Sequence, residues 1–168
     1  VMIAKGGASL LQMEAISAMK KFLLPRSKVI TPNIPEAEVL TGMVIHCTED
    51  KKEAARKLYE YGVKNVVIKG GHDENESEST DILFDGKEFY TFTSQRIETK
   101  NTHGTGCTFS AVITAELAKG ATIHEAVLKA KDFIQAAIED QLEIGQGHGP
   151  TNHWAYGKRN RTRELARK

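Results

Sequence analysis

One glycine-rich stretch carries the residues best suited to chemistry. Gly104, Thr105 and Gly106 stand where a loop turns into a small, apolar segment. Glycines at such a place let backbone N–H groups converge, and the helix N-terminus adds positive potential, so the pattern indicates an anion site. No Gly-Lys-Ser/Thr follows at the spacing of a Walker A loop. Because glycine-rich turns of this length are common, the residues alone leave a structural turn equally open.

Cys107 falls in the first turn of the helix predicted there. The positive end of a helix favours a thiolate, which could accept a proton or act as a nucleophile. A small, buried core residue is the competing interpretation. A Cys–His hydrolytic pair with His103 is a weaker hypothesis, because such partners are usually distant in sequence.

Further polar residues follow two predicted strands. Asn33 and Glu36 come after the first strand, and Lys69 and Gly70 end the second. A carboxamide and a carboxylate there could organise Mg²⁺ through its bound waters, although Glu36 could equally just complement a helix dipole. Lys69 lies where open α/β sheets bind ligands, whereas a lone loop lysine is ordinarily solvated.

Helix and strand signals alternate along the chain and must position these groups. Helices are predicted at residues 9–24, 35–42, 49–61 with Thr48 as N-cap, from the glycines to Gly120, and at 122–140. Strands are predicted at 28–33 and 65–71, an exposed loop at 72–80, and a hairpin around the two-residue turn Asp85-Gly86. The alternation predicts an α/β fold with a mainly parallel sheet.

Composition excludes several classes of protein. The 168 residues are 40% hydrophobic and 27% charged, as in a soluble globular domain, and the apolar runs are too short for a membrane span. Two cysteines, Cys47 and Cys107, indicate a reducing cytoplasm. Residues 157–168 hold six basic residues and one Glu and predict a disordered tail, with nucleic acid or anionic lipid as the alternative partner.

The chain opens on "VMIAKGG", which reads as the end of a strand with no structure before it. A central strand without neighbours would expose a sheet edge, so we expect a longer protein of which this is the C-terminal part.

Six segments together resemble one family. "VMIAKGG", "TPNIPEAEVLTG", "VVIKGGH", "DILFDG", "TKNTHGTGCTFSA" and "GHGPTNHW" occur in this order. They resemble bacterial hydroxymethylpyrimidine/phosphomethylpyrimidine kinases of thiamine biosynthesis, from Val1 to about Tyr156. The combination of "THGTGCT" with "GHGPTNH" is the most specific part.

The resemblance implies a ribokinase-like three-layer fold over residues 1–156, with the N-terminal part of the domain missing. It also implies ATP-dependent phosphorylation, with Mg²⁺, of 4-amino-5-hydroxymethyl-2-methylpyrimidine and then of its monophosphate. A homodimer is implied, with no nucleic-acid or membrane partner.

The resemblance also implies roles for particular residues. Gly104, Thr105 and Gly106 form the anion hole, and Cys107 stands where related sugar kinases carry a catalytic Asp. Asn33 and Glu36 match a magnesium-organising Asn-x-x-Glu pattern, and Lys69 with Gly70 lies near the nucleotide phosphates.

Three alternatives remain open. A pyridoxine or pyridoxal kinase shares the family's glycine–cysteine loop, and the absent pocket residues would decide between them. A catalytically silent fragment or interaction domain is the alternative outside enzymes. A metal site built from His46, Cys47, His72, His103 and Cys107 is disfavoured, since their spacing matches no zinc pattern.

Overall fold

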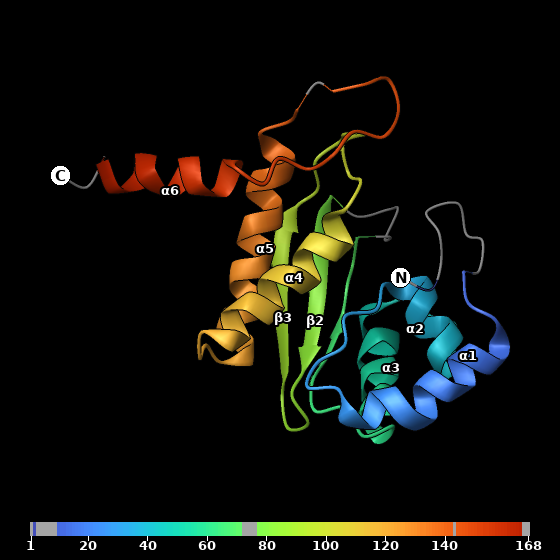
Figure 1. Cartoon of the computed structure of the whole chain (residues 1–168). Coiled ribbons are helices and arrows are strands. Elements are labelled where there is room, and N and C mark those ends of the chain that lie inside the picture. The colour runs from blue at the N-terminus through green and yellow to red at the C-terminus, as the bar shows by residue number, and fades with distance from the viewer. Residues whose placement is uncertain (1, 3–9, 72–76, 143, 166–168) are drawn as a thin grey trace. The chain divides into compact units, whose positions relative to one another are not determined.

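A computed structural model describes Met2 and residues 10–71, 77–142 and 144–165 (Figure 1). The chain divides into two compact units, Val1–Thr93 and Ser94–Lys168. Helices and a sheet together confirm the α/β class. The expected opening strand falls on residues outside the described ranges, apart from Met2.

The helix predicted at residues 9–24 begins later and is broken. α1 covers Met13–Ala18, then the chain winds through a π-helical turn, η1 (Met19–Leu23), and a 3₁₀ turn, η2 (Leu24–Arg26). Pro25 lies inside η2, at a position where its missing N–H costs no hydrogen bond. Proline therefore changes the helix type here and does not mark the chain's exit from helical structure.

The next two helices begin at reciprocal side-chain contacts. α2 (Ile34–Thr41) has Asn33 as N-cap, and it ends at Gly42, whose φ of 70° is left-handed. α3 (Thr48–Glu60) is capped by Cys47, so the assignment of Thr48 as N-cap is wrong by one residue. The reason is Asp50, whose carboxylate accepts the N–H groups of His46 and Cys47 at 2.9 and 3.1 Å.

The sheet of the described residues has the order β1 (Val66–Ile68), β2 (Glu78–Phe84), β3 (Phe89–Gln95). β1 and β2 are antiparallel, because the short connection between them has no room for a crossover helix. The parallel part is the predicted strand at 28–33, which forms isolated bridges from Ile30 to Val66 and from Asn33 to Lys69. The "mainly parallel" expectation thus holds for that pairing but not for β1 and β2.

Two local expectations are corrected by the sheet. Residues 78–80 of the predicted acidic loop belong to β2, while 72–76 lie outside the described residues. In the hairpin, the N–H of Asp85 donates to the Glu88 carbonyl at 3.3 Å, which places Gly86 and Lys87 at the centre of the turn. Gly86 has a φ of 93°, and this is the conformation that requires glycine.

The core of the first unit lies where α3 packs against β1 and β2. Leu58, Val66 and Ile68 are completely buried there. Their burial fixes the end of β1, and hence the place from which Lys69 and Gly70 extend.

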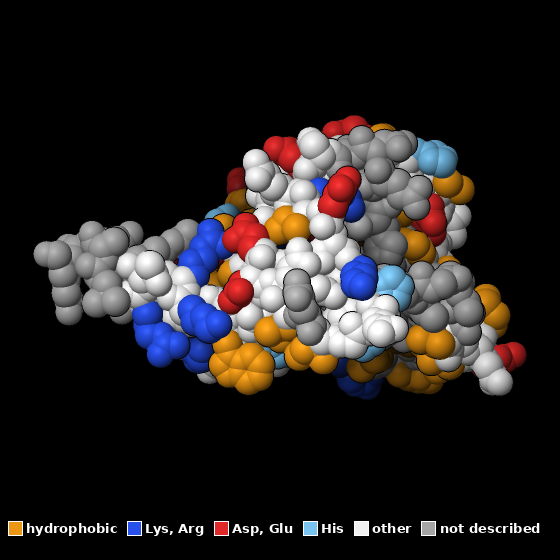
Figure 2. All heavy atoms as spheres, turned by 90° about the horizontal axis from the view of Figure 1, so that it is seen from above, with side chains coloured by type: hydrophobic (Ala, Val, Ile, Leu, Met, Phe, Trp, Pro, Cys, Tyr) orange, Lys and Arg blue, Asp and Glu red, His pale blue; other side chains and the backbone are white. Residues whose placement is uncertain are grey.

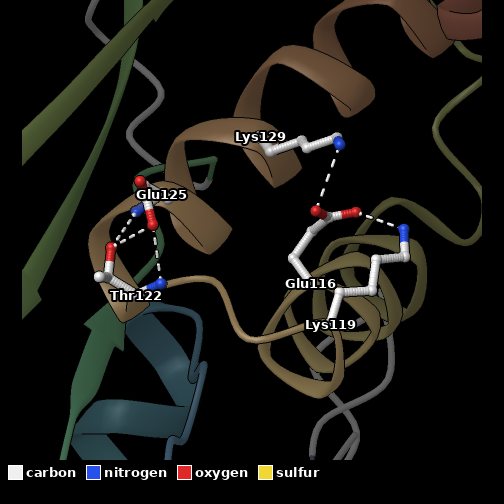
Figure 3. Close-up of polar contacts among 5 residues, drawn as sticks. All are labelled: Glu116, Lys119, Thr122, Glu125 and Lys129. Carbon is white, nitrogen blue, oxygen red and sulfur yellow. Dashed lines mark hydrogen bonds and ion pairs between the residues drawn. The ribbon is translucent and has the colours of Figure 1, made fainter.

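The second unit contains α4 (Thr105–Ala118), α5 (Ile123–Glu139) and α6 (Ala155–Leu165). α4 and α5 pack against each other (Figure 1). Thr122 and Glu125 form the expected capping box, with the Thr122 N–H donating to the Glu125 carboxylate at 2.8 Å (Figure 3).

Charged side chains also join α4 to α5. Glu116 accepts from Lys119 at 2.8 Å and from Lys129 at 3.2 Å (Figure 3). Both lysines hydrogen-bond the same carboxylate and lower the pKa of Glu116 below its ordinary value. The helix pair is therefore held at its turn as well as along its apolar contact.

Residues 157–165, expected as part of a disordered tail, lie in α6. Arg159 pairs with Glu139 at 3.2 Å and with Asp132 at 3.9 Å, and Lys158 lies 3.6 Å from Asp140. The acidic side chains at the end of α5 thus give this basic segment a surface to pack on. Figure 2 shows Lys and Arg side chains gathered along α6.

Among the residues that the structure describes, no helix is long and apolar enough to cross a bilayer.

Gly70 generates a test of this fold. A Cβ added there would lie 2.2 Å from the Thr80 carbonyl oxygen, whereas one added at Gly71 would meet nothing within 4 Å. We expect Gly70→Ala to lower the free energy of unfolding by about 1–3 kcal/mol through overpacking, and Gly71→Ala to change it by less than about 0.5 kcal/mol. Urea denaturation of the two variants measures the difference, and equal effects would contradict the close approach to β2.

Candidate functional site

The first turn of α4 exposes backbone donors. Gly104 is its N-cap, with φ 86° and ψ 0°, a left-handed conformation that glycine adopts without strain. No side chain caps this helix. Thr105 turns back to the loop, since its N–H and hydroxyl both donate to the Thr102 carbonyl, at 3.4 and 3.1 Å. The N–H groups of Gly106 and Cys107 have no acceptor within the described part of the chain.

Two longer helices of the chain cap these groups with their own side chains, whereas the short helix α1 also begins without a side-chain cap. In α2 and α5 a polar N-cap side chain and the Glu three residues later form a reciprocal box. An α-helix leaves its first N–H groups without intrahelical partners, and at α4 no side chain supplies one. Of the starts of α2, α4 and α5, only that of α4 leaves backbone donors open to an external anion among the described residues.

Cys107 is exposed, with buried Thr108 and Phe109 beside it. The interpretation of Cys107 as a core residue does not fit this placement. Its thiol lies on the same helical turn as the unpaired N–H groups.

A second segment, residues 147–153 or "GHGPTNH", borders this turn on both sides. Before the turn, the N–H of His103 donates to the Gly149 carbonyl at 3.2 Å, and His103 forms a parallel bridge with Pro150. After it, the Thr108 hydroxyl and His153 Nε2 are 2.9 Å apart. The two most specific motifs of the sequence are thus neighbours in space.

Asn101 explains why one of these residues is glycine. A Cβ at Gly149 would lie 2.1 Å from Asn101 Oδ1. Asn101 is buried and donates through Nδ2 to Gln141 at 3.2 Å. Sequence reasoning assigned no role to Asn101, Gly149 or His153; the dense glycines and histidines outside any predicted element were the available signal.

In the first unit, Asn33 and Glu36 are held by each other. The Glu36 N–H donates to Asn33 Oδ1 at 2.8 Å, and the Asn33 N–H donates to Glu36 Oε2 at 3.0 Å. Glu36 Oε1 accepts the Met2 N–H at 2.9 Å. Glu36 thus lies in the first turn of α2, as the helix-dipole interpretation expects, and it also closes a capping box that the sequence analysis did not predict.

Glu36 is charged despite its burial. Burial alone would raise the pKa of this carboxyl, but N–H bonds from Asn33 and Met2 and the positive charge of Lys69 together lower it. Lys69 forms the parallel β-bridge to Asn33, and its side-chain ammonium donates to the Thr31 carbonyl. The structure thus brings Asn33, Glu36 and Lys69 together at one sheet end.

This group fits magnesium only through water. Both Glu36 oxygens already accept backbone N–H bonds, so each retains only part of its capacity. Across the described residues, no three His, Cys, Asp or Glu side chains cluster to hold a metal, and His72 lies outside that part. Mg²⁺ commonly keeps several waters and binds through phosphates with few carboxylates, and Glu36 suits that outer role.

Gly70 has a packing role next to its expected nucleotide role. Its N–H donates to the buried Asp81 carboxylate at 2.8 Å. Asn33, Glu36, Lys69 and Gly70 belong to the first unit, and the four residues 104–107 to the second.

The chain is similar to known proteins over most of its length. The family model described as "Phosphomethylpyrimidine kinase" matches residues 1–152. A curated relative from Bacillus subtilis (strain 168), named hydroxymethylpyrimidine/phosphomethylpyrimidine kinase, is 55% identical over 160 residues. The match covers 95% of this chain and 59% of the length of that relative.

Two solved structures are also similar. A pyridoxal kinase from Staphylococcus aureus, in complex with AMP-PCP and pyridoxal, gives a TM-score of 0.85 at 38% identity, over 90% of this chain and 56% of that one. A phosphomethylpyrimidine kinase from Clostridium difficile 630 gives a TM-score of 0.70 at 41% identity, over 82% of this chain and 55% of that one. The chain therefore spans under two thirds of the length of these relatives.

The lowered pKa of Glu36 predicts a pH dependence of stability. In the unfolded chain the Glu36 carboxyl has a pKa near its ordinary value of 4.5. Just below pH 4.5, the unfolded chain therefore binds more protons at Glu36 than the folded chain does. Stability from Glu36 is thus present above pH 4.5 and lost as the pH falls toward the folded-state pKa. We expect Glu36→Gln to be less stable at neutral pH but to lose stability less steeply on acidification. Parallel acid profiles for the two proteins, measured by urea denaturation, would contradict this.

Proposed function

Because this chain belongs to the phosphomethylpyrimidine kinase family, we propose that its protein transfers the γ-phosphoryl group of ATP to hydroxymethylpyrimidine and then to the monophosphate. The observation that carries the proposal is that the N–H groups of Gly106 and Cys107, at the start of α4, find no acceptor among the described residues. They supply donors at the positive end of a 14-residue helix.

Phosphoryl transfer needs mainly position and charge stabilisation. The substrate hydroxyl oxygen attacks the γ-phosphorus, the bond to the bridging oxygen of ADP breaks, and the hydroxyl proton leaves to Cys107 Sγ. The N–H groups of Gly106 and Cys107 hold the oxygens of the transferring group. In the second transfer the nucleophile is a phosphate oxygen of the monophosphate, which has no hydroxyl proton to lose when ionised.

The remaining residues receive supporting roles. Gly104 supplies the left-handed turn, and Thr105 anchors it through Thr102. Lys69 and Gly70 are assigned to the nucleotide phosphates. Asn33 and Glu36 would hold Mg²⁺ through its waters, and the bound ion would supply neutralisation of the phosphate charge. We also propose that the whole protein is a homodimer and lies in the cytoplasm.

Pyridoxal phosphorylation is the second candidate, and a specific observation favours it. The pyridoxal kinase from Staphylococcus aureus has the higher TM-score of the two solved structures, 0.85 against 0.70. Sequence identity points the other way, at 55% to the Bacillus subtilis pyrimidine kinase against 38% to that pyridoxal kinase. Identity compares the side chains of the matched residues, whereas a TM-score compares only the backbone, so we favour the pyrimidine.

A substrate comparison tests the choice. We expect the whole protein to release ADP from Mg·ATP with hydroxymethylpyrimidine and its monophosphate, and more slowly with pyridoxal. A coupled ADP-release assay at equal substrate concentrations measures all three. A preference for pyridoxal would overturn the assignment.

Cys107 provides the mechanistic test. Cys107→Ala should lower kcat by roughly 10²- to 10⁴-fold, the loss expected for a positioned proton acceptor. ATP binding and Tm should change little, because the side chain is exposed. Cys107→Asp should keep more activity than Cys107→Ala, since a carboxylate can take the proton.

Cys47→Ala is the matched control, because Cys47 is the other exposed cysteine and lies at the start of α3. It should keep the wild-type kcat. Near-normal turnover in Cys107→Ala would instead leave catalysis to the N–H groups and the metal.

A further inference from the structure

The 147–153 segment touches the residues immediately on either side of the four-residue turn 104–107. His103, just before Gly104, donates its N–H to Gly149, and Thr108, just after Cys107, bonds to His153. The two contacts are 3.2 and 2.9 Å long. A turn held at both ends has far less freedom to rotate than one held at one end.

The segment is itself fixed to α5. The Asn152 N–H donates to the Ala137 carbonyl, and Asn152 Nδ2 donates to Asp140, both at 3.0 Å. Asn152 is 3% exposed, so these bonds are shielded from water. The Ala137 carbonyl is among the last of α5, which the helix cannot satisfy internally. The segment therefore connects the end of α5 to the beginning of α4.

Close packing adds a steric constraint. Asn101 fills the space beside Gly149, with its Oδ1 2.1 Å from where a Cβ would lie, and His148 Nδ1 is 3.3 Å from the Lys100 carbonyl oxygen. The chain entering the turn is thus held in register with residues 147–150 over several consecutive positions.

We propose that the 147–153 segment sets the orientation of the Gly106 and Cys107 N–H groups, with His153 as a positioning residue that acts through Thr108. This inference rests on the proposed phosphoryl transfer for its catalytic consequence. His153 touches neither substrate nor phosphate in it. Its ring instead fixes the helix turn that presents the donors.

The test is a set of variants at one hydrogen bond. His153→Ala and Thr108→Val each remove it, and each should lower kcat about tenfold, the cost of a small misplacement of catalytic groups. KM for ATP should change by less than about twofold, because the displaced donors act chiefly on the transition state. The double variant should be no slower than the slower single variant, since both remove the same bond.

Two further variants separate positioning from general stability. His153→Gln retains a group able to bond Thr108 and should recover most of kcat. His124→Ala, at another exposed histidine of the same unit, should keep the wild-type kcat and Tm. Wild-type kcat in both His153→Ala and Thr108→Val, or a Gln variant as slow as the Ala variant, would overturn the proposal.

A second readout does not depend on activity. The backbone amide NMR signals of Gly106 and Cys107 should move in His153→Ala and in Thr108→Val, and stay in place in His124→Ala. Unmoved signals would overturn the positioning role. A wild-type protein that transfers no phosphate, but whose signals move as expected, would overturn the proposed function and leave the positioning role standing.

Discussion

An α-helix cannot satisfy its own first N–H groups, and the chain answers this constraint in two ways. At α2 and α5 a polar N-cap and a glutamate close a reciprocal box. At α4 the N-cap is glycine, which has no side chain to accept a hydrogen bond. The N–H groups of Gly106 and Cys107 have no acceptor among the described residues. A glycine N-cap in place of Ser, Thr, Asn or Asp gives up only a few tenths of a kcal/mol of stability. The proposed phosphate cradle is what this arrangement provides in return.

The same capping chemistry serves a second purpose in the first unit. The box between Asn33 and Glu36 keeps a carboxylate charged although it is buried, because backbone N–H bonds and Lys69 outweigh the cost of desolvation. A charged, fixed carboxylate can accept hydrogen bonds from the waters of a bound cation without first losing a proton. Capping and cation binding are therefore compatible roles for Glu36.

Sequence reasoning predicted these features unevenly, for physical reasons. Helix starts marked by local chemistry were located closely, because their signals lie within one turn: the start expected at Pro35 is one residue late, and the box of Thr122 with Glu125 is correct. Strand pairing was harder: the expectation of a mainly parallel sheet overlooked the short connection that makes β1 and β2 antiparallel, and the parallel bridges of β1 join residues distant in sequence. The helical state of residues 157–165 was missed, because the ion pairs between this segment and α5 join residues that are distant in sequence. The candidate turn 104–107 was located from the sequence. The contacts of its flanking residues His103 and Thr108 with Gly149 and His153 could not be read from spacing, since more than forty residues separate the partners.

Binding of the transferring phosphoryl group at the start of α4 can be tested by a crystal structure of the whole protein with Mg²⁺, a non-hydrolysable ATP analogue and hydroxymethylpyrimidine. We expect terminal phosphate oxygens about 2.7–3.2 Å from the backbone nitrogens of both Gly106 and Cys107. We also expect the pyrimidine hydroxyl next to Cys107 Sγ. Phosphates bound elsewhere, with those two N–H groups facing only solvent, would contradict it.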